Sequence, residues 1–318
     1  MKIAKYIAFT IILMACIGCV DCGIECSSYK TFLGTKAWDF AKAIYRGDTV
    51  KMGEILNDDP SLLNYCDTDG WSILMHVVRN QTLVRFPHTL YNDSQYSGNP
   101  EDNPENKIVF CYLLNKGADV NIQGEFGITA LTIACSNVNG DSEYVKLLLA
   151  HGAKTDVEVL TPATGHIFGP CTPLMYAVHS ERKDYIDLLL SYGADIDHTN
   201  NVGSRALSEA MWISHKTQGY SMVLYLLSLG ADYTTPYCKY WRTINNDRIS
   251  NNDRISFVEN LRYQMNRLGS REHKQKMEIV DFLRKNGIDY KKVPIPEEIV
   301  EFAKRDYPDS WQEYLDKY

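Results

Sequence analysis

The chain has 318 residues, a formal net charge of −7 and 45% hydrophobic residues. This composition supplies enough apolar side chains for a continuous core in a chain of this length. The acidic balance, together with the lack of any stripe rich in Arg and Lys, argues against nucleic acid as the main partner.

The first residues are typical of an export signal. Lys2 and Lys5 precede an apolar run over residues 7–15, which is too short for an ordinary membrane-spanning helix. Small residues and two cysteines, Cys16 and Cys19, follow directly. The layout predicts an exported protein.

The junctions around these two cysteines are similar to the lipobox of bacterial lipoproteins. The resemblance implies cleavage and lipidation at Cys19 or Cys16, with residues 1–18 as the signal peptide and residues 19–36 as a tether. It implies a protein of the cell envelope, held to a membrane by an N-terminal lipid. The alternative is a cleaved signal without a lipid, which would give a secreted or periplasmic soluble protein.

A second interpretation of the same segment is redox chemistry. Cys16, Cys19, Cys22 and Cys26 follow a C-x2-C-x2-C-x3-C pattern, which is the spacing of a ferredoxin-type iron–sulfur run. A redox or iron–sulfur protein with accessory repeats is therefore the alternative function. We favour export, because the pattern overlaps the signal, no Pro follows Cys26, and no second cysteine cluster exists. We expect no cofactor and no metal.

A phrase with two leucines and Gly-Ala recurs through the middle of the chain. It occupies residues 113–121, 148–156, 189–197 and 226–234, and its glycines are spaced 35, 41 and 37 residues apart. A period in this range predicts stacked repeats. The leucines are expected near the end of an amphipathic helix, which the glycine ends in a left-handed conformation. The Asp or Asn that follows favours a tight turn.

A second element precedes each phrase, most clearly at residues 127–134 and 171–178. In the latter, Thr172 is expected to cap a helix whose first residue is Pro173. These two alternating elements resemble the ankyrin repeat family. The Thr-Pro-Leu-x-x-Ala start of that family is present at residues 172–177, and weaker copies are found at residues 72–77, 129–134 and 205–210.

The resemblance implies an all-α fold, an ankyrin-repeat solenoid of about six stacked helix-turn-helix repeats with short hairpin turns. It covers residues 37–290, and its first and last repeats depart from the family pattern, as repeats with one face toward water do. After the break at Pro294 and Pro296, two short amphipathic helices are expected. Residues 291–318 are therefore predicted to form a C-terminal helical cap, with Trp311 and Tyr314 on one face.

Three insertions interrupt the period. Residues 80–106 are polar and acidic, residues 157–170 contain Ile167 and Phe168, and residues 235–256 include a six-residue duplication. Loops on a rigid scaffold often carry binding, so the second insertion is the favoured one for a partner contact.

No catalytic motif is found. The eight histidines lack metal-ligand spacing, and the chain contains no phosphate-binding loop and no nucleophile elbow. The paired carboxylates Asp67 and Asp69 lie in a turn phrase, where Asp is a turn former. Cys111 and Cys135 are expected to be small buried hydrophobes. We expect the chain not to be an enzyme.

The predicted function is a protein–protein interaction scaffold that binds an unidentified protein through a concave face and turn tips, as a monomer. Exposed groups near the tips, Trp71, Phe126 and Phe168, are the predicted partner anchors. His179 is predicted to line the concave face. A purely structural envelope component is the third hypothesis.

Overall fold

A computed structural model describes residues 31–32, 34–79, 104–159, 170–217, 219–238 and 254–317. The predicted signal peptide (1–18), Cys16, Cys19 and most of the predicted tether lie outside the described residues. The described part of the chain falls into two compact units, which meet in the sequence between Asp195 and Ile196.

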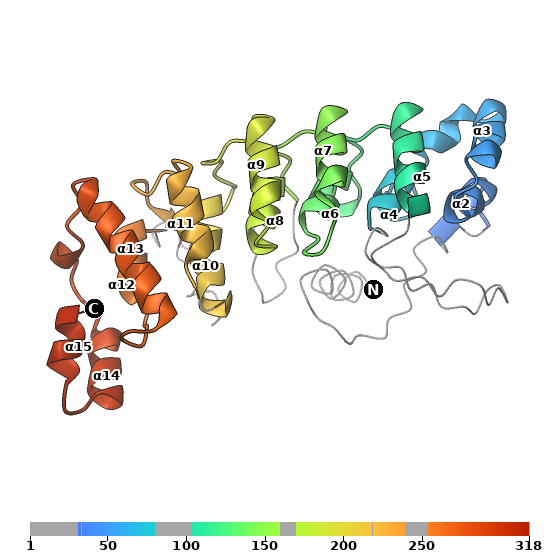
Figure 1. Ribbon diagram of the computed structural model, residues 1–318. Helices are drawn as coiled ribbons and strands as arrows, with labels where there is room; N and C mark the ends of the chain where they lie inside the picture. The colour runs from blue at the N-terminus through green and yellow to red at the C-terminus, as the bar shows by residue number, and fades with distance from the viewer. Residues whose placement is uncertain are drawn as a thin grey trace. The chain divides into compact units, whose positions relative to one another are not determined.

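The first unit is built from antiparallel pairs of an inner and an outer helix that stack side by side (Figure 1). Its elements are α2 (Trp38–Tyr45), α3 (Thr49–Asp58), η2 (Pro60–Asn64), α4 (Ile73–Arg79), α5 (Pro104–Asn115), η3 (Glu125–Gly127), α6 (Ala130–Cys135), α7 (Ser142–Ala150), α8 (Pro173–His179) and α9 (Lys183–Ser191).

Local sequence explains where the inner helices begin. The Thr172 side chain caps α8 by accepting from the Met175 N–H, and Pro173 holds the first position, as predicted. Thr129 and Thr132 form a reciprocal capping box at the start of α6. Two buried N–H groups of this helix start are thereby satisfied within the helix itself.

The recurring glycines end the outer helices as predicted. Gly117 and Gly152 have φ values of 86° and 83°, a left-handed conformation that a side chain would strain. In the same two phrases, Leu113 and Leu148 are fully buried. The Leu-Leu-x-x-Gly-Ala phrase is therefore a core contact followed by a helix stop.

The second unit holds two further helix pairs and a terminal helical hairpin (Figure 1). Its elements are α10 (Ala206–Thr217), α11 (Ser221–Ser228), β1 (Tyr237–Cys238), β2 (Arg254–Ile255), α12 (Phe257–Tyr263), α13 (Arg271–Lys285), η5 (Tyr290–Lys292), α14 (Glu297–Asp306) and α15 (Trp311–Lys317).

The terminal hairpin has a small core of its own. Ile299, Ala303 and Tyr314 are buried in it, and Phe302 and Trp311 pack against them. The two helices fall where the predicted C-terminal cap places them, and the Tyr314 hydroxyl donates to the Asn266 carbonyl. The hairpin is thus attached to the loop that follows α12.

Six helix pairs within the described residues make the predicted all-α ankyrin-repeat fold, which is confirmed. The first insertion is shorter than predicted, because α5 begins at Pro104, a residue suited to the first turn of a helix. The third insertion is closed by a two-residue antiparallel ladder between β1 and β2. Residues 80–103, 160–169 and 239–253 of the three insertions lie outside the described residues.

Candidate functional site

Three hairpin fingers precede the inner helices of the first unit, at residues 64–72, 121–129 and 156–172. In finger 1, the Asp67 N–H donates to the Trp71 carbonyl at 3.0 Å. In finger 2, the Gly124 N–H donates to the Ile128 carbonyl at 2.8 Å. An isolated antiparallel bridge between Val159 and Cys171 closes finger 3 at its base. Backbone hydrogen bonds therefore fix the shape of each described hairpin.

A ladder of polar side chains joins each finger to the next repeat. Asn64 accepts from the Asp119 N–H at 2.9 Å, and Asn121 accepts from the Lys154 N–H at 2.9 Å. The Asn121 amide also donates to the Gly152 carbonyl at 2.9 Å. Because these side chains accept from backbone groups of a neighbouring repeat, they fix the spacing of the fingers.

The ladder continues at finger 3, where Asp156 accepts from the Asp195 N–H at 3.3 Å. The finger backbones are also in direct contact, since the Glu125 N–H donates to the Asp69 carbonyl at 3.0 Å. The three fingers of the first unit therefore form one connected surface, with its register set by hydrogen bonds from repeat to repeat.

From the sequence, the Asn and Asp residues of the repeat phrases were predicted to form tight turns, and the ladder was not predicted. The signal was present, because Asn121 and Asp156 both stand four residues after a repeat glycine. Their bonding partners, Lys154 and Asp195, both stand two residues after the next one. A polar acceptor at a fixed offset from the glycine would have indicated a contact between repeats.

Finger 1 is held to α4 by a buried hydrogen bond between His76 and Asp67. The His76 Nε2 lies 2.9 Å from the Asp67 carboxylate, and the side chains are 3% and 2% exposed. Asp67 also accepts from the N–H groups of Asp69 and Trp71. The His76 ring packs edge-on against Phe32, with ring centroids 5.1 Å apart.

Both members of this pair have a lowered pKa. Burial disfavours the imidazolium and lowers the pKa of His76, more than the adjacent Asp67 raises it. Burial alone would raise the pKa of Asp67, but the hydrogen bonds from His76 and Trp71 outweigh it and keep that pKa low. The pair therefore combines a carboxylate with a neutral imidazole that donates to it near neutral pH.

The predicted anchors are placed differently from one another. Trp71 is only 8% exposed, so the expectation that it is an exposed tip residue is wrong. Its indole packs against the His76 ring and under the Arg79 guanidinium because it occupies the buried finger base. Phe126 is half-buried at the tip of finger 2, with a left-handed φ of 64°. His179 is half-buried at the end of α8, and Phe168 lies outside the described residues.

The inner helices present little side-chain surface. All six residues of α6 are buried, and in α4 and α8 only the last residue, Arg79 or His179, is half-buried. In this structure, apart from Asn64 at the base of finger 1, the exposed positions of the described fingers are instead at their tips. These are Thr68 and Asp69 in finger 1 and Gln123 and Glu125 in finger 2.

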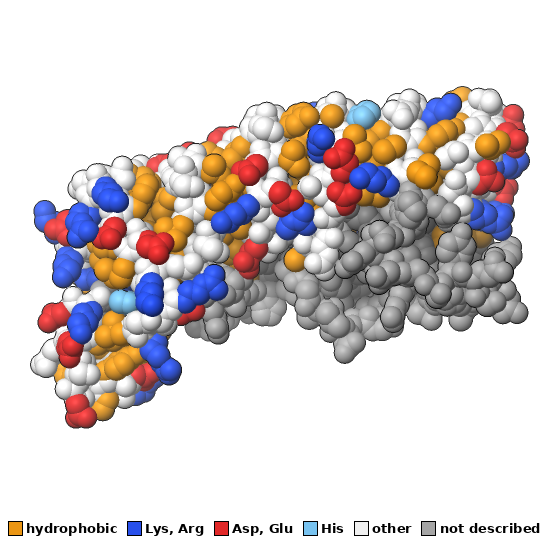
Figure 2. Space-filling model, in the orientation of Figure 1, with side chains coloured by type: hydrophobic (Ala, Val, Ile, Leu, Met, Phe, Trp, Pro, Cys, Tyr) orange, Lys and Arg blue, Asp and Glu red, His pale blue; other side chains and the backbone are white. Residues whose placement is uncertain are grey.

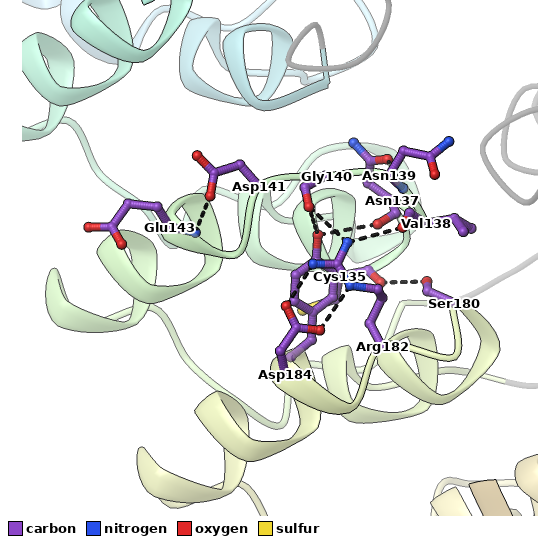
Figure 3. A network of polar contacts seen from close by, with 11 residues as sticks. Cys135, Asn137, Val138, Asn139, Gly140, Asp141, Glu143, Ser180, Arg182 and Asp184 are labelled. Carbon is purple, nitrogen blue, oxygen red and sulfur yellow. Dashed lines mark hydrogen bonds and ion pairs between the residues drawn. The ribbon is translucent and has the colours of Figure 1, made fainter. Parts of the chain in front are cut away.

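A second polar network joins repeats at the opposite end of the helix pairs, where inner helices end and outer helices begin (Figure 3). Arg182 donates to the carbonyls of Val138 and Gly140, at 3.0 and 2.8 Å, and forms a two-point contact with Asp184. Its guanidinium lies 3.9 Å from the Tyr185 ring centroid. The Arg182 side chain thus connects two consecutive repeats through hydrogen bonds.

Gly140 is required at this junction by close approach. The buried Tyr185 hydroxyl donates to the Gly140 carbonyl at 2.8 Å, and a Cβ at Gly140 would lie 2.6 Å from that hydroxyl oxygen. The Ser180 hydroxyl adds a bond to the Cys135 carbonyl at 2.7 Å. The network satisfies backbone carbonyls of the loop after α6.

Four cysteines whose side chains the structure describes are free thiols. Cys135 and Cys171 are buried, and Cys66 and Cys111 are half-buried. Burial raises the pKa of the Cys135 thiol well above its ordinary value, and raises that of Cys66 to a lesser degree. Cys135 is therefore a small apolar core residue, as predicted, while Cys111 is only partly buried.

No cluster of three or more potential metal ligands occurs within the part of the chain that the structure describes. None of the helices among those residues combines the length and apolar character needed to span a bilayer.

The stacked helix pairs, the hairpin fingers and the ladder between them define a repeat scaffold of the ankyrin type. Comparison with known families agrees, because the model for ankyrin repeats, in three copies, matches residues 102–200. Ankyrin repeats imply a protein–protein interaction scaffold.

Three relatives are similar to parts of this chain. An ankyrin repeat protein of Fowlpox virus (strain NVSL) is 30% identical over 150 residues, which are 47% of this chain and 24% of that protein. A second one from the same virus is 35% identical over 105 residues, 32% of this chain and 28% of that protein. The human transient receptor potential cation channel subfamily A member 1 is 33% identical over 90 residues, 28% of this chain and 7% of that protein. The chain spans less than a third of the length of each of these relatives.

Proposed function

We propose that the chain is an exported, lipid-anchored scaffold that captures one protein partner on the tips of its fingers. The observation that supports this most directly is the ladder through Asn64, Asn121 and Asp156, because it fixes neighbouring fingers in register before any partner arrives. A preformed surface lowers the ordering cost of association. The fingers are thus suited to binding, and the described core residues to holding them still.

The chemistry of the tips indicates what they would bind. Asp69 and Glu125 are exposed on adjacent fingers whose backbones are hydrogen-bonded to each other. Phe126 stands next to Glu125 in a left-handed conformation, which is uncommon for a bulky residue and is found at functional sites more often than elsewhere. An aromatic anchor flanked by carboxylates fits a partner segment with an apolar side chain beside basic ones.

Site-specific photocrosslinking in the native host tests the binding surface. A photoreactive residue is placed at Gln123 on the tip of finger 2, and the matched control is Lys146, which is exposed on the outer helix α7. We expect one partner to be enriched from Gln123 and not from Lys146. The same partner set from both positions would indicate a structural envelope component without a defined binding face.

Variants separate binding from packing. Phe126→Asn keeps a residue that tolerates the left-handed conformation but removes the ring, so capture is expected to fall while the thermal midpoint stays within about 2 °C of wild type. His179→Ala tests the predicted contribution of the end of α8 in the same way. If Phe126→Asn unfolds the first unit, the ring is part of the core and the binding surface lies elsewhere.

Export and anchoring have their own test. The proposal rests on the apolar run 7–15 and the lipobox-like junctions at Cys16 and Cys19, in a segment outside the described residues. Mass spectrometry of the mature protein is expected to find an acylated Cys16 or Cys19 at the N-terminus. An unprocessed Met1 would refute export, and a cleaved but unacylated terminus would favour a soluble envelope protein.

A further inference from the structure

The second unit contains a fully buried lysine at the point where its terminal hairpin is attached. Lys276, in the middle of α13, is 0% exposed, and its Nζ donates to the Gln264 carbonyl at 3.0 Å. The same carbonyl accepts from the Asn266 side-chain amide at 3.4 Å. The segment 264–266 between α12 and α13 is therefore held from the side of α13.

Asn266 is the junction between that segment and its neighbours. Its side-chain amide donates to the Tyr220 hydroxyl at 2.9 Å, and its carbonyl accepts from the Tyr314 hydroxyl at 3.0 Å. Tyr314 belongs to α15 and is 1% exposed. A continuous path of hydrogen bonds thus runs from the Lys276 amine through the segment 264–266 to the C-terminal hairpin.

A buried arginine lies beside Lys276. Arg262 of α12 is 4% exposed, and its guanidinium lies 4.4 Å from the Tyr290 ring centroid. The Lys276 Nζ lies 5.7 Å from the same ring. Two basic side chains therefore converge on one aromatic ring in a buried region.

We propose that Lys276 is a pH-dependent latch for the terminal hairpin: as an uncharged amine it holds the segment 264–266, and on protonation it releases that segment together with α14 and α15. Burial, and next the charge of Arg262, lower the pKa of Lys276 well below its ordinary value. An ammonium at this site would be buried beside a guanidinium, away from the water that hydrates it in the unfolded chain.

The other titratable groups around the latch do not change charge on mild acidification. Burial raises the pKa of Tyr290 on η5 to about 12, and it also raises the pKa values of Tyr220 and Tyr314. On α13 itself, the hydrogen bond to Ser270 lowers the pKa of Glu272, one turn before Lys276. These phenols stay neutral and the carboxylate stays ionised.

His273 is the remaining titratable neighbour on this helix. Its ring accepts from the Gly269 N–H at 3.4 Å and lies 3.4 Å from the Lys317 carbonyl of α15. Because His273 also contacts the terminal hairpin, the experiment has to separate its contribution from that of Lys276.

Hydrogen exchange of the full chain, read by mass spectrometry and corrected for intrinsic rates, tests the latch. Between about pH 7.5 and about pH 5.5, amides of α14 and α15 are expected to exchange at least about tenfold faster in wild type, while those of α10 in the same unit are unchanged. Lys276→Met cannot take up a proton, so the hairpin should stay protected at both values. Should the methionine variant fail to fold, Lys276→Gln keeps a donor without titrating and serves the same purpose.

Two matched variants complete the design. Lys274→Met alters an exposed lysine of the same helix, and His273→Gln removes the neighbouring imidazole. Both should keep the acid response of wild type. The latch is refuted if hairpin protection does not depend on pH in wild type, if Lys276→Met responds as wild type does, or if His273→Gln abolishes the response.

Discussion

The inner helix α10 of the second unit begins with different chemistry from the inner helices α6 and α8 of the first unit. In the first unit, neutral groups stand at the starts of the inner helices. The hydroxyls of Thr129 and Thr172 cap α6 and α8 there. In the second unit, Arg205 stands at the corresponding place, only 4% exposed, with its guanidinium donating to the Asp232 carboxylate at 2.9 Å. It also donates to the Thr235 carbonyl.

The difference shows what happens when a repeat departs from the family phrase. The backbone pattern survives, because Ser208 accepts from the Arg205 N–H at 2.8 Å as Thr132 does from Thr129 at 2.9 Å. The side chain at the helix start, however, has become a buried cation that needs a carboxylate partner. Stability at the start of α10 therefore depends on a pair of charges, and at the starts of α6 and α8 on hydroxyl caps.

The largest effect is expected from Arg205→Met. Removing the guanidinium takes away its hydrogen bonds to the Asp232 carboxylate and the Thr235 carbonyl, which should lower the free energy of unfolding by about 2 to 3 kcal/mol. Urea unfolding combined with hydrogen exchange should show this loss in residues 196–317 and no change in residues 31–195. Arg267→Met, at an exposed arginine, is the control. An equal loss from both variants would mean that burial of the charge is not what distinguishes the second unit.

Asn121→Ala is expected to have the next largest effect, in the first unit. It removes two hydrogen bonds to backbone groups of the following repeat, which should lower the free energy of unfolding by about 1 to 2 kcal/mol. Asn121→Asp keeps the acceptor, as at the natural Asp156, and should cost less. Gln123→Ala, two residues further on at an exposed position, should be near neutral. If Asn121→Ala is also neutral, the ladder does not stabilise the stack.

These ladder residues mark the limit of what the sequence could predict. Periodicity gave the helix pairs, the caps at Thr172 and the helix stops at Gly117 and Gly152, because each depends on residues within a few positions. The ladder bonds join residues 31 to 55 positions apart, so a turn former and a bridging acceptor look alike in the sequence.

Burial of single side chains was harder still to predict. Trp71 was predicted to be exposed because it follows a turn, yet it occupies the finger base, where Arg79 and His76 cover it. Nothing in the sequence around Lys276 distinguishes it from an exposed lysine of a helix. It is buried because Gln264, after α12, and Tyr290, in η5, pack around it. Whether a long polar residue meets water depends on neighbours that are distant in the sequence.

Acidification should weaken the first unit through finger 1. The pKa of His76 is lowered in the folded state, so below the ordinary value of 6.5 the unfolded chain binds more protons. Stability is therefore full above about pH 6.5 and is lost as the pH falls through that range, by about 1.4 kcal/mol for each unit of difference in pKa. Asp67, with its own lowered pKa, adds a further loss at more acidic pH.

Unfolding of residues 31–195 by urea, followed from about pH 7 to about pH 5, measures this slope. His76→Gln keeps a donor for Asp67 and cannot titrate, so its slope should be flatter than that of wild type. His151→Gln, at an exposed histidine that bonds the Leu147 carbonyl, should leave the slope unchanged. A steep slope that survives in His76→Gln would place the acid-sensitive group elsewhere in the unit.

The smallest effect is expected where a charged contact between repeats is exposed. Lys107 of α5 lies 2.9 Å from Asp141 at the start of α7, and the two side chains are 44% and 50% exposed. Lys107→Met should change the free energy of unfolding by no more than about 0.5 kcal/mol, and less at high salt, because water screens the pair. Like Asn121, Lys107 contacts the next repeat, but with an exposed ion pair in place of bonds to backbone groups. If Lys107→Met loses as much stability as Asn121→Ala, any contact between repeats stabilises the stack. If its loss is negligible, the ladder stabilises the stack because its side chains bond to ordered backbone groups.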